Sequence, residues 1–143
     1  MRVVKWAQAL RLRRDRPTEY LTLEGDPPHG QRLFIYAGVP LIACVQATQK
    51  GIYNSMLLDV VAYDAETVTL RDREGGGEYP LSHEWVRLHT RSGHCYTKAS
   101  AQGRTIPGGI GVYDTAHPRF SRRQLYTCSV SYTHLTLPTI CSV

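Results

Sequence analysis

The residues best suited to chemistry lie in one polar stretch, His94–Ile106, which reads H-C-Y-T-K-A-S-A-Q-G-R-T-I. It brings hydroxyl, amide and unsubstituted backbone groups close together in the chain: Thr97, Ser100, Gln102, Gly103 and Thr105. Such groups suit phosphate oxygens or a sugar–phosphate backbone better than an apolar ligand. The same spacing is also typical of an ordinary turn, so the segments on either side must decide the interpretation.

The composition is that of a globular protein with room for one ordinary domain. The chain has 143 residues, of which 42% are hydrophobic and 20% are charged, and it has no apolar run long enough to span a bilayer. The formal net charge of +5 mildly favours a polyanionic partner. Four cysteines show no C-x-x-C spacing, which predicts reduced thiols and neither a zinc site nor a redox pair: Cys44, Cys95, Cys128 and Cys141.

The beginning of the chain predicts a short amphipathic helix. Apolar residues recur there at helical spacing: Val3, Trp6, Ala7 and Leu10. The helix is expected to end before Pro17, because a residue that precedes proline is pushed out of the helical region. The basic cluster Arg11–Arg16 is open to two interpretations, a phosphate contact or, more commonly, a solvated face.

From Arg32 onward the pattern changes to short β-strands separated by polar or glycine-rich turns. The expected strands are Leu33–Tyr36, Val39–Val45, Leu57–Tyr63 and Thr67–Leu70, with Tyr79–Leu81 and Trp85–Leu88 closing the module. Strands at roughly ten-residue spacing predict a small, strongly bent sheet or barrel. Pro40 must lie at a strand start or edge, because it has no N–H to donate to a ladder.

One more strand and one more helix are expected after the polar stretch. Ile110–Tyr113 predicts a short buried strand with Asp114 at its carboxyl end, where polar groups of α/β sheets tend to face a site. Ser121 is expected to cap a helix that begins at Arg122. Basic residues in a first helical turn oppose the macrodipole, so a functional demand for positive charge is one explanation for them.

This order of features resembles the C-terminal part of superfamily 1 DNA helicases of the Pif1/RecD-like type, with a UvrD-like C-terminal domain. In that family an SH3-like β-barrel is inserted into the second RecA-like domain, and the chain returns from it into motif V, commonly T-x-H-x-x-Q-G-x-T. The matching residues are Thr97, Ser100, Gln102, Gly103 and Thr105. Ala99 stands where the family often has histidine, so that histidine's contact to nucleic acid is not carried over.

Two further segments carry the resemblance, which covers roughly Leu33–Cys128. The family has a G-x-P-L…G-x-x-N stretch where the barrel begins, and the residues that match it here are Gly38, Pro40, Gly51 and Asn54. Leu125–Cys128 resembles the start of motif VI, commonly L-Y-x-A-x-S-R. The arginine that ends motif VI, expected to contact the ATP γ-phosphate, would lie beyond Cys128.

The resemblance implies an α/β fragment, part of RecA-like helicase domain 2A with an inserted SH3-like β-barrel. Residues 1–31 would be a partial upstream helix and loop, and 32–90 the SH3-like insertion. Residues 91–129 would be the return of the RecA-like domain with motif V and part of motif VI. The implied function is that of a fragment of an ATP-dependent helicase, located in the cytoplasm or at a phage or viral replication site.

The implied site divides into two groups of residues and includes no catalytic residue and no metal ligand. Contacts to single-stranded DNA or RNA would come from Thr97, Ser100 and Thr105, and coupling to ATP from Gln102, Gly103 and Arg104. ATP and Mg²⁺ would act in the intact parent enzyme, together with a missing N-terminal RecA-like domain. The sequence has no G-x-x-x-x-G-K-[ST] phosphate loop, so we expect this fragment to bind neither cofactor alone and to be inactive by itself. No membrane partner is expected.

The last residues resemble something other than a protein. Val130–Thr139 reads V-S-Y-T-H-L-T-L-P-T, which resembles a translated transposon mosaic-end adapter used in sequencing libraries. We therefore expect residues 130–143 to be an adapter-derived artefact of a metagenomic read. On that expectation the native sequence differs after about Ser129 and is not known before Met1.

Three other interpretations compete with this resemblance. A stand-alone nucleic-acid-binding β-barrel module without motor activity fits the net charge and the strand pattern, but leaves the segments after Thr105 without a purpose. A metal site is disfavoured because its candidate ligands fit no common zinc spacing: His83, His89, His94 and Cys95. Asp114 and His117 suggest acid–base chemistry less readily than capping and turn chemistry.

Overall fold

The computed structural model describes residues 2–25, 31–96, 111–113, 115, 116, 118, 120–122 and 126. The chain divides into two compact units, Met1–Cys95 and Tyr96–Val143. The first unit contains all the named helices and strands. Within the described residues no helix is long and apolar enough to cross a membrane.

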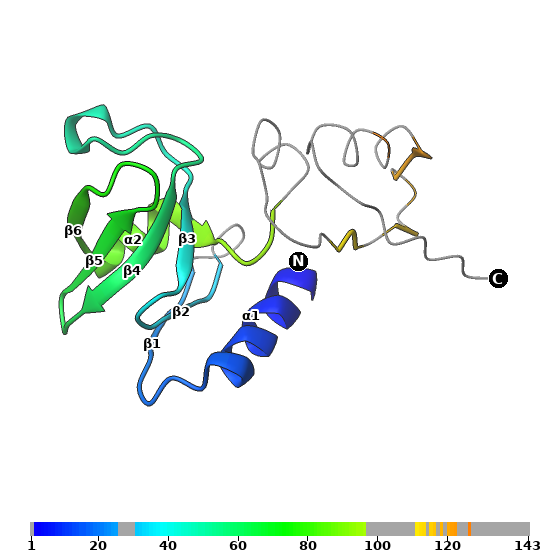
Figure 1. Ribbon diagram of the computed structural model, residues 1–143, viewed down its shortest axis with the longest axis horizontal. Coiled ribbons are helices and arrows are strands. Elements are labelled where there is room, and N and C mark those ends of the chain that lie inside the picture. The colour runs from blue at the N-terminus through cyan, green and yellow to red at the C-terminus, as the bar shows by residue number, and fades with distance from the viewer. Residues whose placement is uncertain are drawn as a thin grey trace. The chain divides into compact units, whose positions relative to one another are not determined.

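The first element, α1, is a helix that spans Arg2–Asp15 and lies outside the sheets (Figure 1). Its sequence has neither glycine nor proline and is rich in strong helix formers. It ends where Arg16 takes a left-handed backbone with φ of 43° and donates its N–H to the Leu12 carbonyl oxygen at 3.1 Å. The predicted end before Pro17 is confirmed.

The predicted apolar face of this helix does not face the sheets. Trp6 and Leu10 are 51% and 50% exposed, whereas Gln8 is buried and Leu12 packs against the core. The reason is tertiary: the helix is held through a different face, because the Tyr36 hydroxyl donates to the Asp15 carboxylate at 2.8 Å. Gln8, Leu12 and Asp15 follow one another at helical spacing and so share that face.

A small antiparallel pair, β1 (Leu21–Leu23) and β2 (Leu33–Ile35), follows α1. The remaining strands form a five-stranded antiparallel sheet in the order β6-β5-β4-β3-β7. Its members are β3 (Pro40–Ala43), β4 (Leu57–Tyr63), β5 (Thr67–Asp72), β6 (Glu78–Ser82) and β7 (Thr90–Ser92). A one-turn 3-10 helix, η1 (Thr48–Lys50), interrupts the connection from β3 to β4. The predicted mixed α/β composition is therefore confirmed.

The sheet has two edges, β6 and β7, so no closed barrel is found among the described residues. The pairing of β4 with β5 shifts between Val60 and Ala62, which marks a β-bulge in β4. Bulges bend a strand and increase its twist. The prediction of a small sheet built from short strands is confirmed.

The core lies where the inward faces of these strands meet. Its large buried side chains are aliphatic; those of β2, β4 and β5 come from alternate positions, and Ile52 comes from the connection between β3 and β4. The set is Leu33, Ile35, Leu41, Ile52, Leu58, Val60, Val68 and Leu70. Pro40 is the first residue of β3, as predicted. It lacks an N–H, but its carbonyl still accepts a hydrogen bond from Gly93 at 2.8 Å.

One predicted strand is wrong. Trp85–Leu88 is part of helix α2, which spans His83–His89 between β6 and β7. The Ser82 side chain caps this helix by accepting the Trp85 N–H at 3.3 Å, and only Val86 of its residues is buried. Local capping therefore outweighs the β-branched and aromatic composition of this segment.

In the second unit, Gly111, Val112 and Tyr113 lie in no strand, which differs from the strand predicted for Ile110–Tyr113. Arg122 and Tyr126 have helical backbone. Ser121, the predicted cap, is exposed, and Asp114 and His117 lie outside the described residues.

Candidate nucleic-acid interface

The predicted contact residues lie outside the described part of the chain: Thr97, Ser100, Gln102, Gly103, Arg104 and Thr105. Their roles therefore stay predictions. What the structure does describe is the framework that leads into them, which is β7 and the residues up to Tyr96.

The chain leaves the sheet beside the point where it enters it. β7 pairs with β3 so that Ser92 stands opposite Leu41, and the Gly93 N–H donates to the Pro40 carbonyl at 2.8 Å. A Cβ on Gly93 would lie 2.9 Å from the Pro40 backbone, so this close approach requires glycine. The Ser92 N–H also donates to the Gln31 side-chain oxygen at 2.8 Å. Two strands and one side chain thus fix the backbone immediately before the polar stretch.

A cluster of polar side chains links this exit to α1. The Tyr36 hydroxyl donates to Asp15, and burial, reinforced by that hydrogen bond and the carboxylate charge, raises the pKa of Tyr36. Burial and the nearby Arg11 guanidinium lower the pKa of His94, against the opposing effect of Asp15. His94 is therefore neutral at pH 7. Sequence analysis missed this cluster because its members are far apart in the chain.

The four residues that carry the predicted resemblance before β4, Gly38, Pro40, Gly51 and Asn54, lie in loops or at a strand start. Gly38 has a φ of +85° and donates its N–H to the Val60 carbonyl at 2.7 Å. Gly51 ends η1 with a φ of +70°, and the Asn54 N–H donates to the Gln46 side chain at 3.3 Å. Pro40 starts β3. These residues therefore have a structural explanation that needs no ligand.

The next residue, Ser55, has a φ of +68°, which is costly for a residue with a Cβ. It closes a tight turn in which the Met56 N–H donates to the Tyr53 carbonyl at 3.1 Å. The turn leaves the Tyr53 ring 54% exposed. The loop between β3 and β4 therefore presents an aromatic side chain on a well-defined turn.

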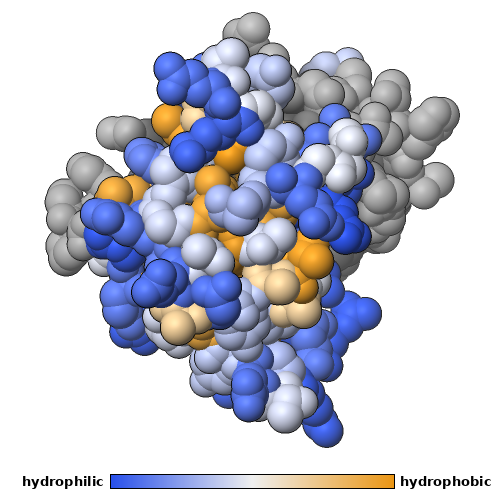
Figure 2. Space-filling model, turned by 90° about the vertical axis from the view of Figure 1, so that its left-hand side faces the viewer, coloured by the Kyte–Doolittle hydropathy of each residue, from blue (hydrophilic) through white to orange (hydrophobic). Residues whose placement is uncertain are grey.

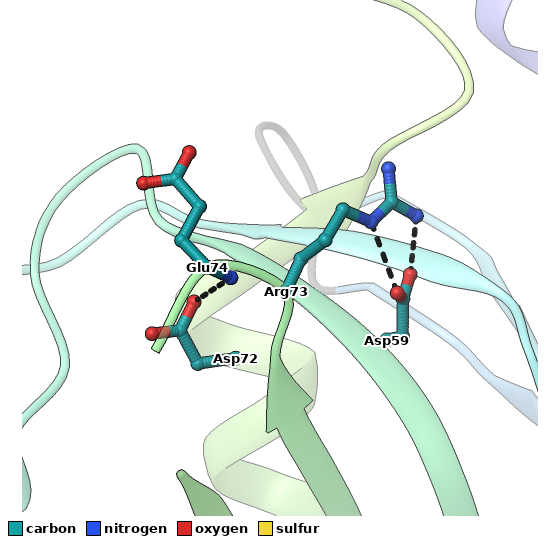
Figure 3. Close-up of polar contacts among 4 residues, drawn as sticks. All are labelled: Asp59, Asp72, Arg73 and Glu74. Atoms are coloured by element: carbon teal, nitrogen blue, oxygen red, sulfur yellow. Dashed lines mark hydrogen bonds and ion pairs between the residues drawn. The ribbon is translucent and has the colours of Figure 1, made fainter. Parts of the chain in front are cut away.

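Two arginines at the β4–β5–β6 side of the sheet, Arg71 and Arg73, are paired with carboxylates. Arg73 makes two contacts to Asp59, with its Nε 3.0 Å from an Asp59 oxygen (Figure 3). Arg71 pairs with Glu78 across the β5–β6 ladder at 2.6 Å. Asp72 accepts the Glu74 N–H and so stabilises the turn beside this pair (Figure 3). Because these guanidinium groups already have anionic partners, they contribute little attraction for phosphate.

The rest of the sheet surface is mixed. Hydrophobic side chains form patches interrupted by hydrophilic ones on the face shown in Figure 2. A groove beside β1 and the end of β4 carries the carboxylates Glu19 and Asp64. The pKa of Asp64 is lowered because its oxygens accept the N–H groups of Glu66 and Thr67. This groove is therefore anionic and unsuited to phosphate.

No group of three or more His, Cys, Asp or Glu side chains within the described ranges is arranged to hold a metal ion. Cys44 and Cys95 are free thiols, and burial raises the pKa of each. Both thiols are therefore protonated at neutral pH, the form in which cysteine is a poor nucleophile and metal ligand.

No protein-family model matches the sequence, and no curated protein matches it. The solved structures similar to this chain include unliganded Pif1 from Bacteroides sp., with 21% identity over 53% of this chain and 20% of that chain, at a TM-score of 0.41. The structure of two coordinating Pif1 helicases at forked double-stranded DNA has 20% identity over 70% of this chain and 29% of that chain, at a TM-score of 0.48. Bacteroides sp. Pif1 in complex with ADP-AlF4 has 21% identity over 53% and 20%, at a TM-score of 0.41. The chain therefore spans less than a third of the length of the solved chains that it matches.

Proposed function

We propose that this chain is a fragment of an ATP-dependent helicase, in which residues 97–105 contact single-stranded nucleic acid and couple that contact to ATP. The fragment belongs to the second RecA-like domain of the parent enzyme, and the five-stranded sheet is an SH3-like module inserted into that domain. By itself the fragment is inactive, because it has no phosphate-binding loop.

The observation that carries the proposal is the meeting of the two ends of the sheet module. The Pro40 carbonyl at its beginning accepts the Gly93 N–H at its end, at 2.8 Å. A module with adjacent ends can be inserted into a host domain without disturbing it. A module that functions alone does not need its two ends to be adjacent.

The strand order supports the SH3-like interpretation. Four strands, β3 to β6, form an antiparallel meander, and the short helix α2 then carries the chain to β7, which pairs with β3. The bulge in β4 bends the strand that two halves of a small barrel would share. The proposal therefore places the barrel's open side between β6 and β7.

The chemistry proposed for the polar stretch rests on residue types and their spacing. The hydroxyls of Thr97, Ser100 and Thr105 would donate to phosphate oxygens, which positions a strand without reading its bases. Gln102, Gly103 and Arg104 would face the nucleotide side. ATP and Mg²⁺ would bind in the parent enzyme, where the missing N-terminal domain supplies the phosphate loop.

The distribution of charge argues against the alternative of a stand-alone nucleic-acid-binding module. Between Gln31 and Tyr96 there are six Lys or Arg residues and seven Asp or Glu residues. Sequence-independent binding to nucleic acid needs unneutralised positive charge. The net charge of the chain is therefore not located in the sheet.

The test is a titration of a fluorescently labelled oligodeoxythymidylate with the whole chain, followed by anisotropy. The variant Thr97→Ala/Ser100→Ala is expected to weaken binding roughly thirtyfold, since each of the two lost hydrogen bonds contributes about 1 kcal/mol. The matched control Thr18→Ala/Thr48→Ala removes two exposed hydroxyls from the first unit. Equal affinity of all three proteins would refute the proposed role of the polar stretch.

A further inference from the structure

The net positive charge of this protein comes from residues that precede and follow the sheet in the sequence. Residues 2–16 contain six basic side chains and one acidic one, whereas residues 31–96 are slightly acidic overall. Four of those six are arginines within a six-residue span, Arg11–Arg16. The N-terminal helix and the residue after it therefore carry a separate excess of charge that the proposed function does not use.

The packing of α1 turns part of that charge outward. The helix is held through Gln8, Leu12 and Asp15, as described above. At 100° per residue, Arg13 and Arg14 lie on the opposite side of the helix, where both are exposed. The same side carries the half-exposed Trp6 and Leu10. Basic and aromatic side chains thus share one outward face.

The arginines of this face differ in their partners from three other arginines of the first unit. Arg32, Arg71 and Arg73 each pair with a carboxylate, at Glu24, Glu78 and Asp59 respectively. Among the described residues, Arg13 and Arg14 form no ion pair. The one acidic residue of the helix, Asp15, already accepts the Tyr36 hydroxyl. The outward guanidinium groups are therefore available to an external anion.

We infer that this face of α1, formed by Trp6, Leu10, Arg13 and Arg14, is a second contact for the sugar–phosphate backbone of a single-stranded nucleic acid. Charge complementarity selects the partner, because guanidinium groups bind phosphates strongly. The exposed indole adds a surface on which a base can stack, which is the usual companion of a basic track in single-strand binding. The inference rests on the proposed function, since it adds a contact to the same class of ligand.

Two other partners fit less well. An amphipathic helix on an anionic membrane needs a broad apolar face, whereas Trp6 and Leu10 are the exposed large apolar side chains among those of α1 that the structure describes. An acidic protein segment is normally recognised with a pocket for its side chains, and the cavity that includes Gln8 of α1 is lined by neither Arg13 nor Arg14. A phosphate backbone needs only the exposed charges.

The experiment measures the affinity of the whole chain for an oligodeoxythymidylate at several salt concentrations. In single strands each neutralised phosphate contributes about 0.7 to the slope of log K against log salt. Arg13→Gln/Arg14→Gln should therefore reduce the slope by about 1.4, which is roughly a 25-fold loss of affinity at about 0.1 M salt. Glutamine has a helix propensity close to that of arginine, so α1 is retained, which circular dichroism checks.

The matched control is Arg32→Gln/Arg71→Gln, which removes the same net charge from arginines that are paired in the folded protein. For this control, the slope of log K against log salt should stay within about 0.3 of the parent value. That is less than half of the contribution of one neutralised phosphate. An equal loss in both variants, or no loss in either, would overturn the inference. A third result would also overturn it: Arg13→Gln/Arg14→Gln loses affinity for phosphatidylserine–phosphatidylcholine vesicles but not for the oligonucleotide. That result would assign the face to a membrane surface.

The same titration separates this inference from the proposed function. If Arg13→Gln/Arg14→Gln lowers the slope while Thr97→Ala/Ser100→Ala has no effect, α1 is a contact and the polar stretch is not. The reverse result keeps the proposed function and removes the second contact. As an independent signal, Trp85→Phe leaves Trp6 as the single tryptophan. The oligonucleotide should then quench its fluorescence, and an unchanged emission would contradict the inference.

Discussion

The helix α1 and the five-stranded sheet differ in how they handle apolar and charged side chains. The sheet buries most of its aliphatic residues, and Arg71 and Arg73 on its β4–β5–β6 side are paired with carboxylates. The helix leaves Trp6 and Leu10 half exposed and its outward arginines without carboxylate partners among the described residues. The exposed arginines on that side of the sheet are thus paired within it, whereas α1 has side chains suited to contacts outside its own unit. We therefore regard the sheet as the scaffold of the first unit and α1 as its surface for binding partners.

The largest expected effect tests this difference with one substitution at two places. Leu70→Ala in β5 should lower the free energy of unfolding by about 3 kcal/mol, because it leaves a cavity at a fully buried site. Leu10→Ala in α1 should change it by less than about 0.5 kcal/mol, since that side chain is half exposed. Urea denaturation followed by circular dichroism measures both. Similar losses in the two variants would show that α1 is part of the core.

A smaller effect on the free energy of unfolding is expected at the end of β7, immediately before the polar stretch. Gly93→Ala should destabilise the protein by about 2 kcal/mol, because the new Cβ would meet the Pro40 backbone at 2.9 Å. Gly76→Ala is the comparison, since that glycine has a φ of +70° but open space around it. It should cost about 1 kcal/mol from backbone strain alone. A Gly93 variant as stable as the parent would mean that the contact with Pro40 is loose.

The smallest expected effect concerns the link between α1 and the sheet exit. The pKa of His94 is lowered in the folded protein, so folding favours its neutral form. This contribution to stability is present above the ordinary pKa of 6.5 and is lost as the pH falls through the lower, folded-state value. His94→Gln should therefore flatten the decline of unfolding free energy below about pH 6.5. If the free energy of unfolding of this variant declined below about pH 6.5 as steeply as that of the parent, His94 would be solvated in the folded protein.

The sequence was most informative where structure is locally encoded. Leu57–Tyr63 forms β4 with the predicted bounds, and the turn at Glu74–Gly77 is present, held by the carboxylate of Asp72. Pro40 begins β3 because its missing N–H excludes it from a strand interior. Each of these features depends on residues within a few positions of one another.

Features defined by distant partners were not predicted. β1 and β7 each have three residues and exist because of their pairing with β2 and β3. The buried face of α1 differs from the apolar pattern of its sequence, because Tyr36 holds Asp15 from 21 positions away. The candidate site was predicted from the spacing of residues 97–105, which lie outside the described residues, so its geometry stays a prediction.

The central claim is that the chain is part of a helicase motor, and sequencing the gene that encodes it tests this claim most directly. The account predicts a G-x-x-x-x-G-K-[ST] phosphate loop upstream in the same reading frame. It also predicts an arginine-ended motif VI in place of residues 130–143. A reading frame that extends several hundred residues upstream without a phosphate loop would contradict the claim and leave the stand-alone module as the better account.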